Sequence, residues 1–320
     1  STSRGLGDVY KRQVIVLMIK VSVVIPVYGV EKFIARSARS LFEQTLDNLE
    51  YIFVNDCTKD YSMEILKDIL EEYPYRKSQV RIIEMPTNSG LPTVRRHGTQ
   101  LATGEYLIHC DSDDWIDADM YRLMYEKAIT DDLDIVWCDY YKSDGSNHYY
   151  ISQRYQPELM QGPLWNKLVR RSIYESNDII YPTANKAEDG VLMTQISFFA
   201  KSRGYIDRPL YFYFINPDSI CGQINEFACV RKLEQEVENT NLRINFLERE
   251  GALNKYESVV LEWKYTARTN LLPLMNIRKY RKLWRNTFAE LNRLYLQSNA
   301  ISIRQKVKFI LIYIGLYRKL

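Results

Sequence analysis

An acidic stretch lies about one third of the way along the chain, where residues 109–117 read HCDSDDWID. It begins at the end of the apolar run YLIHC and holds four carboxylates, Asp111, Asp113, Asp114 and Asp117. Like charges this close repel and raise one another's pKa unless a cation lies between them. In an Asp-x-Asp pair both carboxylates can approach one divalent ion, which prefers oxygen ligands. The residues alone leave a structural turn equally open, because Asp is common at turns and helix starts.

A second acidic pair, Glu188 and Asp189, stands in the motif AEDG ahead of an apolar helical pattern. The positive end of the helix dipole favours acids in the first turn, so the pair has a simple structural explanation. Without further context the residues favour that explanation over a catalytic one. None of the three histidines, His97, His109 and His148, stands in a comparable position, so a carboxylate is the better candidate for a base.

The elements that must position these acids alternate between strand and helix. Apolar runs predict strands at 21–28, 49–56, 80–85, 105–111 and 134–139, with helices between the first four. Continuous apolar strands that alternate with helices indicate a mostly parallel sheet covered on both faces. Ligands of such sheets bind beyond the carboxyl ends of the strands. The segments PVYGVE, NDCTKD and DSDD all fall at those ends.

Composition narrows the class of protein. A length of 320 residues, with 46% apolar and 26% charged residues, is typical of a soluble globular protein with one large or two modest domains. The five cysteines are odd in number and show no CxxC spacing, which favours a reducing compartment over a disulfide framework or a zinc site. No stretch approaches the roughly 20 apolar residues of a membrane-spanning helix.

The C-terminal segment is strongly basic. From Asn276 onward it holds eleven Lys and Arg residues against one acid, Glu290, whereas the whole chain has a net charge of only +3. Its last stretch, IRQKVKFILIYIGLYRKL, mixes basic and apolar residues. The residues leave two alternatives open, which are packing against the rest of the chain and contact with anionic lipid. No nucleic-acid motif accompanies the patch, so we expect no nucleic-acid partner.

Four segments together resemble one known family. They are VIPVYGVEKFI, LEYIFVNDCTKDYS, NSGLPTVRRHGTQLATGEYLIHCDSDDWIDADM and KAEDGVLM, and in order and spacing they resemble the inverting glycosyltransferases of family two, over residues 20–225. The positions that match the family's motifs are Asp56, Asn88, Gly90, Arg95, Gly98, Asp111, Asp113 and Asp114. The departures, Gly29, Asn55, Cys57 and His97, fall beside the expected nucleotide pocket, so they bear on donor identity more than on reaction class.

The resemblance implies a fold and a domain organisation. The fold class is α/β, a GT-A (Rossmann-like) mostly parallel sheet flanked by helices, with a C-terminal helical extension. The catalytic domain is expected at 18–225, with a nucleotide-sugar half at 18–115 and an acceptor half at 116–225. Residues 226–320 are expected to be helical with a basic tail. Residues 1–17 are expected to be non-native or disordered, with native initiation at Met18.

The resemblance also assigns roles to the two acidic pairs. Asp113 is implied to bind Mg²⁺ or Mn²⁺ between the two phosphates of a sugar nucleotide, with Asp111 on the ribose or on a metal-bound water. Asp189 is implied to be the base that deprotonates the acceptor hydroxyl. Glu188 is implied to orient that base or to bind the acceptor.

The nucleotide-sugar site is expected to be formed by Pro26, Tyr28, Glu31, Asp56, Asn88, Gly90, Arg95, Asp111 and Ser112. Tyr28 is expected to cup the base, and Asp56 to accept from a pyrimidine ring N–H, which favours UDP-sugars. Arg95 is expected to contact the diphosphate or the base. The structural alternatives are a buried tyrosine, a turn aspartate and a surface salt bridge.

Two further segments extend the expected site. In LWNKLVRR, Trp165 is expected to stack on an acceptor sugar and Lys167 to meet a phosphate or a sugar hydroxyl, against the alternatives of a core Trp and a solvated Lys. YFINPDSIC, at 213–221 with Pro217 and Asp218 in a turn, resembles the family's lid.

The sequence therefore predicts a metal-dependent inverting glycosyltransferase that transfers a sugar from a nucleotide sugar to a glycan or lipid-linked acceptor in cell-surface polysaccharide synthesis. A cytoplasmic location is expected, with peripheral contact to the inner face of the membrane through the basic tail. The alternatives are a non-catalytic nucleotide- or glycan-binding protein and a magnesium-dependent phosphatase of the haloacid-dehalogenase type. In that phosphatase class Asp-x-Asp follows the first strand, whereas here it follows the fourth.

Overall fold

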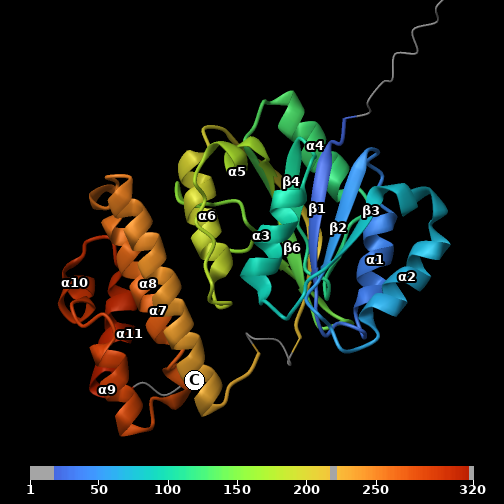
Figure 1. Cartoon of the computed structure of the whole chain (residues 1–320). Coiled ribbons are helices and arrows are strands. Elements are labelled where there is room, and N and C mark those ends of the chain that lie inside the picture. Colours follow the sequence, from blue (N-terminus) through green and yellow to red (C-terminus); the bar gives the residue numbers. More distant parts are fainter. Residues whose placement is uncertain (1–17, 217–221, 317–320) are drawn as a thin grey trace, which may run out of the picture.

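The structure is a computed structural model that describes residues 18–216 and 222–316. The prediction for residues 1–17, and the Pro217–Asp218 turn of the expected lid, lie outside the described residues. Figure 1 shows an α/β body built on one central sheet, with a group of C-terminal helices packed beside it.

The first half of the sheet is parallel, as the apolar runs predicted. It consists of β1 (Val21–Val27), β2 (Leu49–Asn55), β3 (Val80–Glu84) and β4 (Tyr106–His109), in the order β3-β2-β1-β4. β1 pairs with β2 and β4, and β2 pairs with β3, all in parallel register. The carboxyl ends of these strands therefore meet at one edge of the sheet.

Helices cover both faces of this half of the sheet (Figure 1). α1 (Ile34–Phe42) and α2 (Ser62–Glu72) share a core with one set of strand side chains, and α3 (Leu91–Leu101) packs on the opposite set. A Cβ on Gly98 of α3 would lie 2.4 Å from Cγ1 of Val24, so only glycine lets this helix approach β1 so closely.

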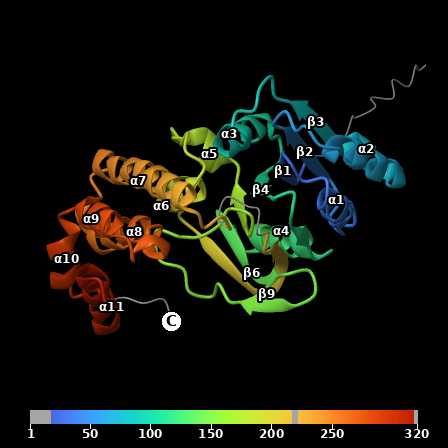
Figure 2. The same cartoon turned by 90° about the horizontal axis from the view of Figure 1, so that it is seen from below.

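The second half of the sheet is mixed, which refines the predicted mostly parallel sheet. β8 (Lys167–Arg170) pairs antiparallel with β4, and β6 (Ile135–Ser143) pairs antiparallel with β8. β9 (Arg203–Phe214) then runs parallel to β6, and both lie side by side in Figure 2. The strand expected at 134–139 is thus separated from β4 by β8, a four-residue strand too short to stand out in the sequence.

Short strands and helices complete this body. β5 (Trp115–Ile116) pairs antiparallel with β9, and β7 (His148–Ile151) pairs antiparallel with β6. The remaining helical elements are η1 (Pro74–Gln79), α4 (Met120–Thr130), α5 (Ser172–Ser176) and α6 (Glu188–Phe199). Strands β7, β8 and β9 thus bring the chain after residue 140 into the same sheet.

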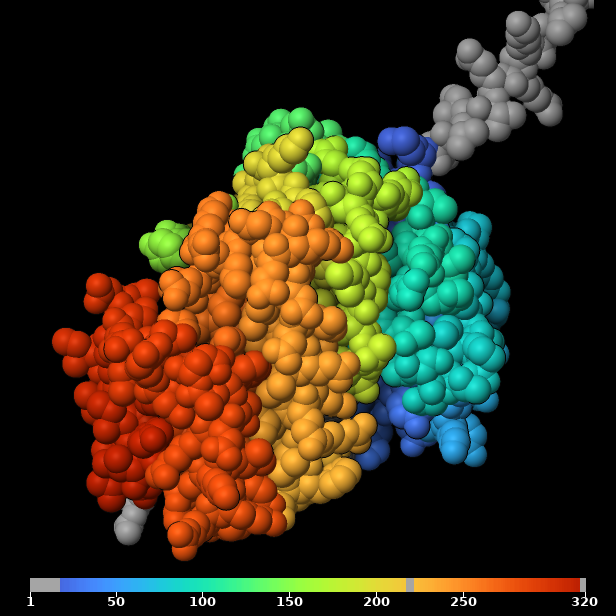
Figure 3. Space-filling model, turned by 60° about the vertical axis from the view of Figure 1, so that its left-hand side comes forward, coloured from blue at the N-terminus to red at the C-terminus, as the bar shows by residue number. Residues whose placement is uncertain are grey.

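The C-terminal region is helical, as predicted. Its elements are α7 (Glu226–Arg249), η2 (Asn254–Tyr256), α8 (Glu257–Thr269), η3 (Leu272–Leu274), α9 (Arg278–Asn286), α10 (Leu291–Gln297) and α11 (Ile303–Ile314). The region has its own buried core, which includes Trp284, Tyr295 and Phe309. Figure 3 shows its orange helices lying against the yellow-green segment that contains α6. Within 18–216 and 222–316, no helix is both long and apolar enough to span a bilayer.

Candidate active site

The loop after β4 is fixed at both of its ends. The backbone N–H of Asp114 donates to the carbonyl of Asp111 at 3.2 Å, which closes a tight turn. The carboxylate of Asp114 is buried and accepts hydrogen bonds from the Tyr211 hydroxyl and from the Phe214 N–H of β9, each at 2.6 Å. Asp114 is therefore an anchor for the loop, in agreement with the structural explanation that the sequence allowed for it.

Ser112 ties the same loop to β1. Its hydroxyl donates to the carbonyl oxygen of Pro26 at 2.6 Å. The N–H of Asp111 donates to the Tyr211 hydroxyl at 3.2 Å, so Tyr211 holds both ends of the turn. Sequence reasoning missed Tyr211, because a tyrosine in an apolar strand carries no signal of this role.

Asp111 and Asp113 remain partly exposed, and their carboxylate oxygens are suitable ligands for a hard cation. Burial, and the charge of Asp111, raise the pKa of Asp113 to about 6. The ionised form of Asp113 is therefore unfavourable unless a cation lies beside it. In the described part of the chain, no group of three or more His, Cys, Asp or Glu side chains is placed to hold a metal ion by itself. Mg²⁺ is often held by one or two carboxylates plus waters and substrate phosphates, so this pair fits such an ion.

An arginine that the sequence did not single out lies beside this loop. Arg36 of α1 donates from Nη2 to the carbonyl oxygen of Asp113 at 3.2 Å, and its guanidinium carbon lies 3.6 Å from the ring centre of Trp115. It therefore places a positive charge next to the acidic stretch. The charge sits 77 residues away in sequence, and no spacing rule connects the two.

Arg95 corrects a prediction. It is not a surface residue that can contact the nucleotide, since only 2% of it is exposed. Its Nη2 binds Oδ1 of Asp111 at 2.6 Å, and its Nη1 binds the carboxylate of Glu188. Both terminal nitrogens are thus engaged, and Arg95 instead joins the two acidic pairs that the sequence had singled out separately.

The second acidic pair opens α6. Glu188 is buried, and burial together with the charge of Asp189 raises its pKa, whereas the Arg95 guanidinium opposes this rise. Asp189 is only partly buried, so it is the member of the pair that a substrate can reach. The residue before them, Ala187, has φ +63°, a left-handed conformation that is rare for a residue with a Cβ.

The loop before α3 gathers three of the expected nucleotide-site residues. The carboxylate of Asp56 accepts from the N–H groups of Ser89 at 2.6 Å and Gly90 at 2.9 Å. The amide of Asn88 donates to the Asp56 carbonyl at 3.3 Å. Gly90 has φ +82°, which favours glycine. Asp56 is buried and acts here as a loop anchor, so a base N–H would have to use its remaining lone pairs.

The residues after β1 are more open. Tyr28 is 53% exposed, so the buried-tyrosine alternative is wrong and its ring is accessible to a ligand. Glu31 lies nearby and is partly exposed, with one carboxylate oxygen accepting from the Tyr61 N–H at 3.1 Å. The N–H of Gly29 donates to the Thr58 hydroxyl at 2.8 Å, which joins the ends of β1 and β2.

The two residues expected on the acceptor side are both buried, which corrects their predicted roles. Trp165 is covered by Tyr211, with ring centres 4.1 Å apart, and Tyr140 meets its edge at 4.8 Å, so it cannot stack on a sugar. Lys167 is 1% exposed and donates to the carbonyl of Pro163 at 2.7 Å and to Asn166 Oδ1 at 2.8 Å. The solvated-lysine alternative is equally wrong.

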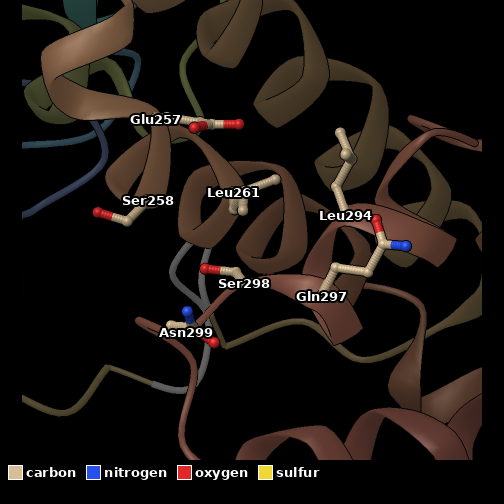
Figure 4. Close-up of a pocket in the computed structure, with 7 residues that line it drawn as sticks. All are labelled: Glu257, Ser258, Leu261, Leu294, Gln297, Ser298 and Asn299. Atoms are coloured by element: carbon tan, nitrogen blue, oxygen red, sulfur yellow. The ribbon is translucent and has the colours of Figure 1, made fainter.

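A pocket in the C-terminal region is a weaker candidate for the functional site. It has a volume of about 350 Å³ and lies between α8 and α10, lined by Glu257, Ser258, Leu261, Leu294, Gln297, Ser298 and Asn299 (Figure 4). Figure 4 shows one carboxylate, that of Glu257, among otherwise neutral side chains. None of the residues singled out in the sequence lines it, and it lacks the convergent charged groups of the loop after β4.

Solved structures share this fold. The S. aureus TarS fragment 1–349 in complex with UDP-GlcNAc superposes with a TM-score of 0.59 at 16% identity, over 94% of this chain and 93% of that one. The mannosyltransferase PcManGT from Pyrobaculum calidifontis, in complex with GDP-Man and Mn²⁺, superposes with a TM-score of 0.52 at 13% identity, over 87% and 86%. The fold is therefore the GT-A fold that was predicted.

Sequence comparison identifies the family. The model described as Glycosyl transferase family 2 matches residues 22–201, more than half of the chain, and the chain belongs to this family. EpsH of Bacillus subtilis (strain 168), named as a glycosyltransferase, is 36% identical over 219 residues, which cover 62% of this chain and 62% of EpsH. The chain thus spans about 62% of the length of this curated relative.

Proposed function

We propose that the protein is a metal-dependent inverting glycosyltransferase, which transfers a sugar from a nucleotide sugar to a hydroxyl of a glycan or lipid-linked acceptor in surface-polysaccharide synthesis. One observation carries the proposal. Arg95 binds Asp111 through Nη2 and Glu188 through Nη1, so the two acidic pairs meet at one guanidinium. Separate sites for donor and acceptor chemistry would have left these pairs apart.

The donor side is the loop after β4. Asp113, with Asp111 beside it, is proposed to hold Mg²⁺ or Mn²⁺, which when bound would stabilise the charge that builds on the departing nucleoside diphosphate. Tyr28 offers an exposed ring for the base, and Asp56 with Asn88 shapes the loop beside it. A UDP-sugar is the proposed donor. The UDP-GlcNAc named in the TarS structure agrees with this choice, whereas PcManGT is named with GDP-Man. The donor panel must therefore include both uracil and guanine nucleotides.

The acceptor side is the start of α6. Asp189 takes the proton of the acceptor hydroxyl as that hydroxyl attacks the anomeric carbon, on the face opposite the leaving nucleotide, so the configuration inverts. Its partial exposure suits this role. Glu188 is buried against Arg95 and orients the pair without reaching the substrate.

A cytoplasmic location with peripheral membrane contact is proposed, and the C-terminal helix α11 supports the membrane contact. Ile303, Val307, Ile310 and Ile314 recur at helical spacing and are all exposed, although they are apolar. Basic residues accompany them on the same helix, at Arg304, Lys306 and Lys308. An exposed apolar stripe flanked by cations is the pattern of a helix that lies in the interface of an anionic bilayer.

Binding and turnover of the full chain test the proposed reaction. We expect thermal stabilisation by UDP-sugars that depends on added Mn²⁺ or Mg²⁺ and disappears with a chelator. Asp113→Ala should lose this metal-dependent binding, whereas Asp189→Asn should keep it and lose transfer. Asp117→Asn is the matched control, because Asp117 belongs to the same acidic stretch but accepts from the Asp119 N–H at 2.9 Å, at a helix start.

The outcomes separate the alternatives. Metal-dependent binding without transfer by the wild-type chain, across the donor panel, would favour a non-catalytic binding protein. Release of free phosphate from phosphomonoesters would favour the phosphatase alternative. Equal loss of donor affinity in Asp113→Ala and Asp189→Asn would contradict the assignment of donor and acceptor roles to the two pairs.

A further inference from the structure

The loop that precedes the second acidic pair is held between two helices. On one side it meets the start of α3, where a Cβ on Gly90 would lie only 2.9 Å from Oδ1 of Asn185. On the other side it meets α7, a helix of the C-terminal region. α7 lies outside residues 22–201, the part of the chain that matches the family model.

One side chain of α7 binds this loop twice. Asn239 is 1% exposed, and its amide nitrogen donates to the carbonyl of Ala184 at 3.0 Å and to the carbonyl of Lys186 at 2.8 Å. Both N–H groups of the amide are therefore used to hold the backbone on either side of Asn185. A buried donor that satisfies two loop carbonyls fixes the course of that loop.

The held segment leads into a strained residue. Ala187 follows Lys186 directly and has φ +63° and ψ 29°, the left-handed conformation. This conformation is unfavourable for a residue with a Cβ and persists only where the surroundings impose it. Glu188 and Asp189 come next and form the first turn of α6, so the direction in which their side chains point depends on Ala187.

A second residue of α7 holds the first turns of α6. Arg243 lies one turn after Asn239, so both side chains project from the same face of α7. Its Nε donates to the Thr194 hydroxyl at 2.9 Å, and its guanidinium stacks 3.5 Å above Trp263 of α8. A Cβ at Gly190 would lie 3.2 Å from Nη1 of Arg243, so the absence of a side chain there gives the guanidinium room.

We propose that Asn239 and Arg243 are positioning residues for the acidic pair, so that helix α7 is part of the catalytic apparatus. The inference rests on the proposed function, because it assigns these residues to the orientation of Asp189 in the transfer reaction. Asn239 fixes the loop and the left-handed Ala187, and Arg243 fixes the turns that follow. The orientation of Asp189, the proposed proton acceptor, thus depends on a region that the family model does not include.

Kinetics of Asn239→Ala in the full chain test the inference. We expect kcat for sugar transfer to fall at least tenfold, with KM for the donor and UDP affinity within twofold of wild type. Thr183→Val is the matched control, because it removes an exposed hydrogen bond of 2.8 Å from Thr183 to Glu238, between the same loop and the same helix. This control should keep kcat within twofold. Equal losses in the two variants would overturn the proposal, since any weakening of the contact would then suffice.

A rescue experiment separates positioning from general loss of structure. If Asn239 acts by holding Ala187 in its left-handed conformation, Ala187→Gly should restore kcat of Asn239→Ala several-fold, because glycine adopts that conformation without a Cβ clash. A double variant no faster than Asn239→Ala would count against the role assigned to Ala187. Should Asn239→Ala not fold, Arg243→Lys carries the kinetic test, with an expected loss of at least threefold in kcat and an unchanged KM.

Hydrogen exchange provides a readout that does not depend on activity. The amides of residues 184–190 should exchange at least tenfold faster in Asn239→Ala than in wild type, with no change across β1 and β4. Unchanged exchange in 184–190 would overturn the proposal whatever the protein catalyses. If exchange is faster in Asn239→Ala but the wild-type chain transfers no sugar, the contact of Asn239 with the loop stands and the proposed function is refuted.

Discussion

Arg95 of α3 and Glu188 of α6 form a buried ion pair between residues 93 positions apart in the chain. Their side chains are 2% and 5% exposed, and the same guanidinium also binds Asp111. This contact joins α3, which covers the parallel half of the sheet, to α6, which packs on the mixed half. It gives the acidic stretch after β4 a cation of its own, supplied by the fold.

Arg95→Met should lower the free energy of unfolding by about 3–5 kcal/mol, because it leaves Glu188 buried without its cation. Urea denaturation measures the change. The control is Arg39→Met, which breaks a salt bridge to Glu72 whose side chains are 42% and 50% exposed, and should cost less than about 1 kcal/mol. Similar losses in the free energy of unfolding for the two variants would show that the buried pair stabilises the fold no more than an exposed one.

Asp114→Ala should cost about 1–3 kcal/mol, because it leaves the buried hydroxyl of Tyr211 and the N–H of Phe214 without their acceptor. It should also weaken donor binding, since the turn that carries Asp113 loses its anchor on β9. Tyr211→Phe removes the other partner of Asp114 and serves as the second arm of a double-mutant cycle. We expect a coupling of at least about 0.5 kcal/mol between the two. Strictly additive losses would argue that the hydrogen bond is not formed in solution.

Lys167 should make the stability depend on alkaline pH. Burial lowers the pKa of its amine to about 7, whereas in the unfolded chain the pKa returns to about 10.4. Between these values the unfolded chain binds more protons than the folded one, so the stability contributed by this residue rises with pH. From pH 8 to 9.5 we expect a gain of up to about 2 kcal/mol in wild type relative to Lys167→Met.

Denaturation curves of the two proteins at both pH values test this sign. Tyrosine ionisation in the unfolded chain affects both proteins alike and cancels in the difference between them. A difference between the variants that stays constant from pH 8 to 9.5 would show that the amine is charged in the folded state throughout.

The exposed face of α11 should bind anionic membranes. Sedimentation with vesicles of phosphatidylglycerol should capture the full chain, whereas phosphatidylcholine vesicles should not, and high salt should weaken the capture. Val307→Glu together with Ile310→Glu should reduce binding at least tenfold. Ile129→Glu is the control, because Ile129 is exposed to a similar extent but lies on α4. If the double variant instead changes the oligomeric state and leaves vesicle binding intact, the stripe is an interface between copies of the chain.

Much of the fold followed from local pattern. The apolar runs of β1, β2 and β4 are continuous because these strands are buried on both faces, and the spacing of α1 and α2 is regular because each helix buries one face. β8 and the mixed half of the sheet were not predictable in this way. A four-residue strand has too few residues to show a period, and its antiparallel pairing with β4 and β6 depends on segments far apart in the chain.

The residues of the candidate site likewise fall into those that the sequence could indicate and those that it could not. Sequence alone singled out the acidic stretch 111–114 and the pair Glu188–Asp189 as candidates, because carboxylates grouped at an element's end are a chemical signal visible in the order of residues. It could not assign Arg95, Trp165 or Lys167 correctly, since an arginine, a tryptophan or a lysine looks the same in sequence whether it is exposed or buried.

Tertiary structure alone decided which charges face each other. Burial, and contacts across 16 to 100 residues, place Arg36, Arg95 and Tyr211 around the acids of the β4 loop. They also place Asn239 of α7 against the loop before Asp189. The physical reason is that the charge state of a side chain depends on its solvation, and its contacts depend on distances in space. Neither quantity can be read from the residues that neighbour it in the sequence.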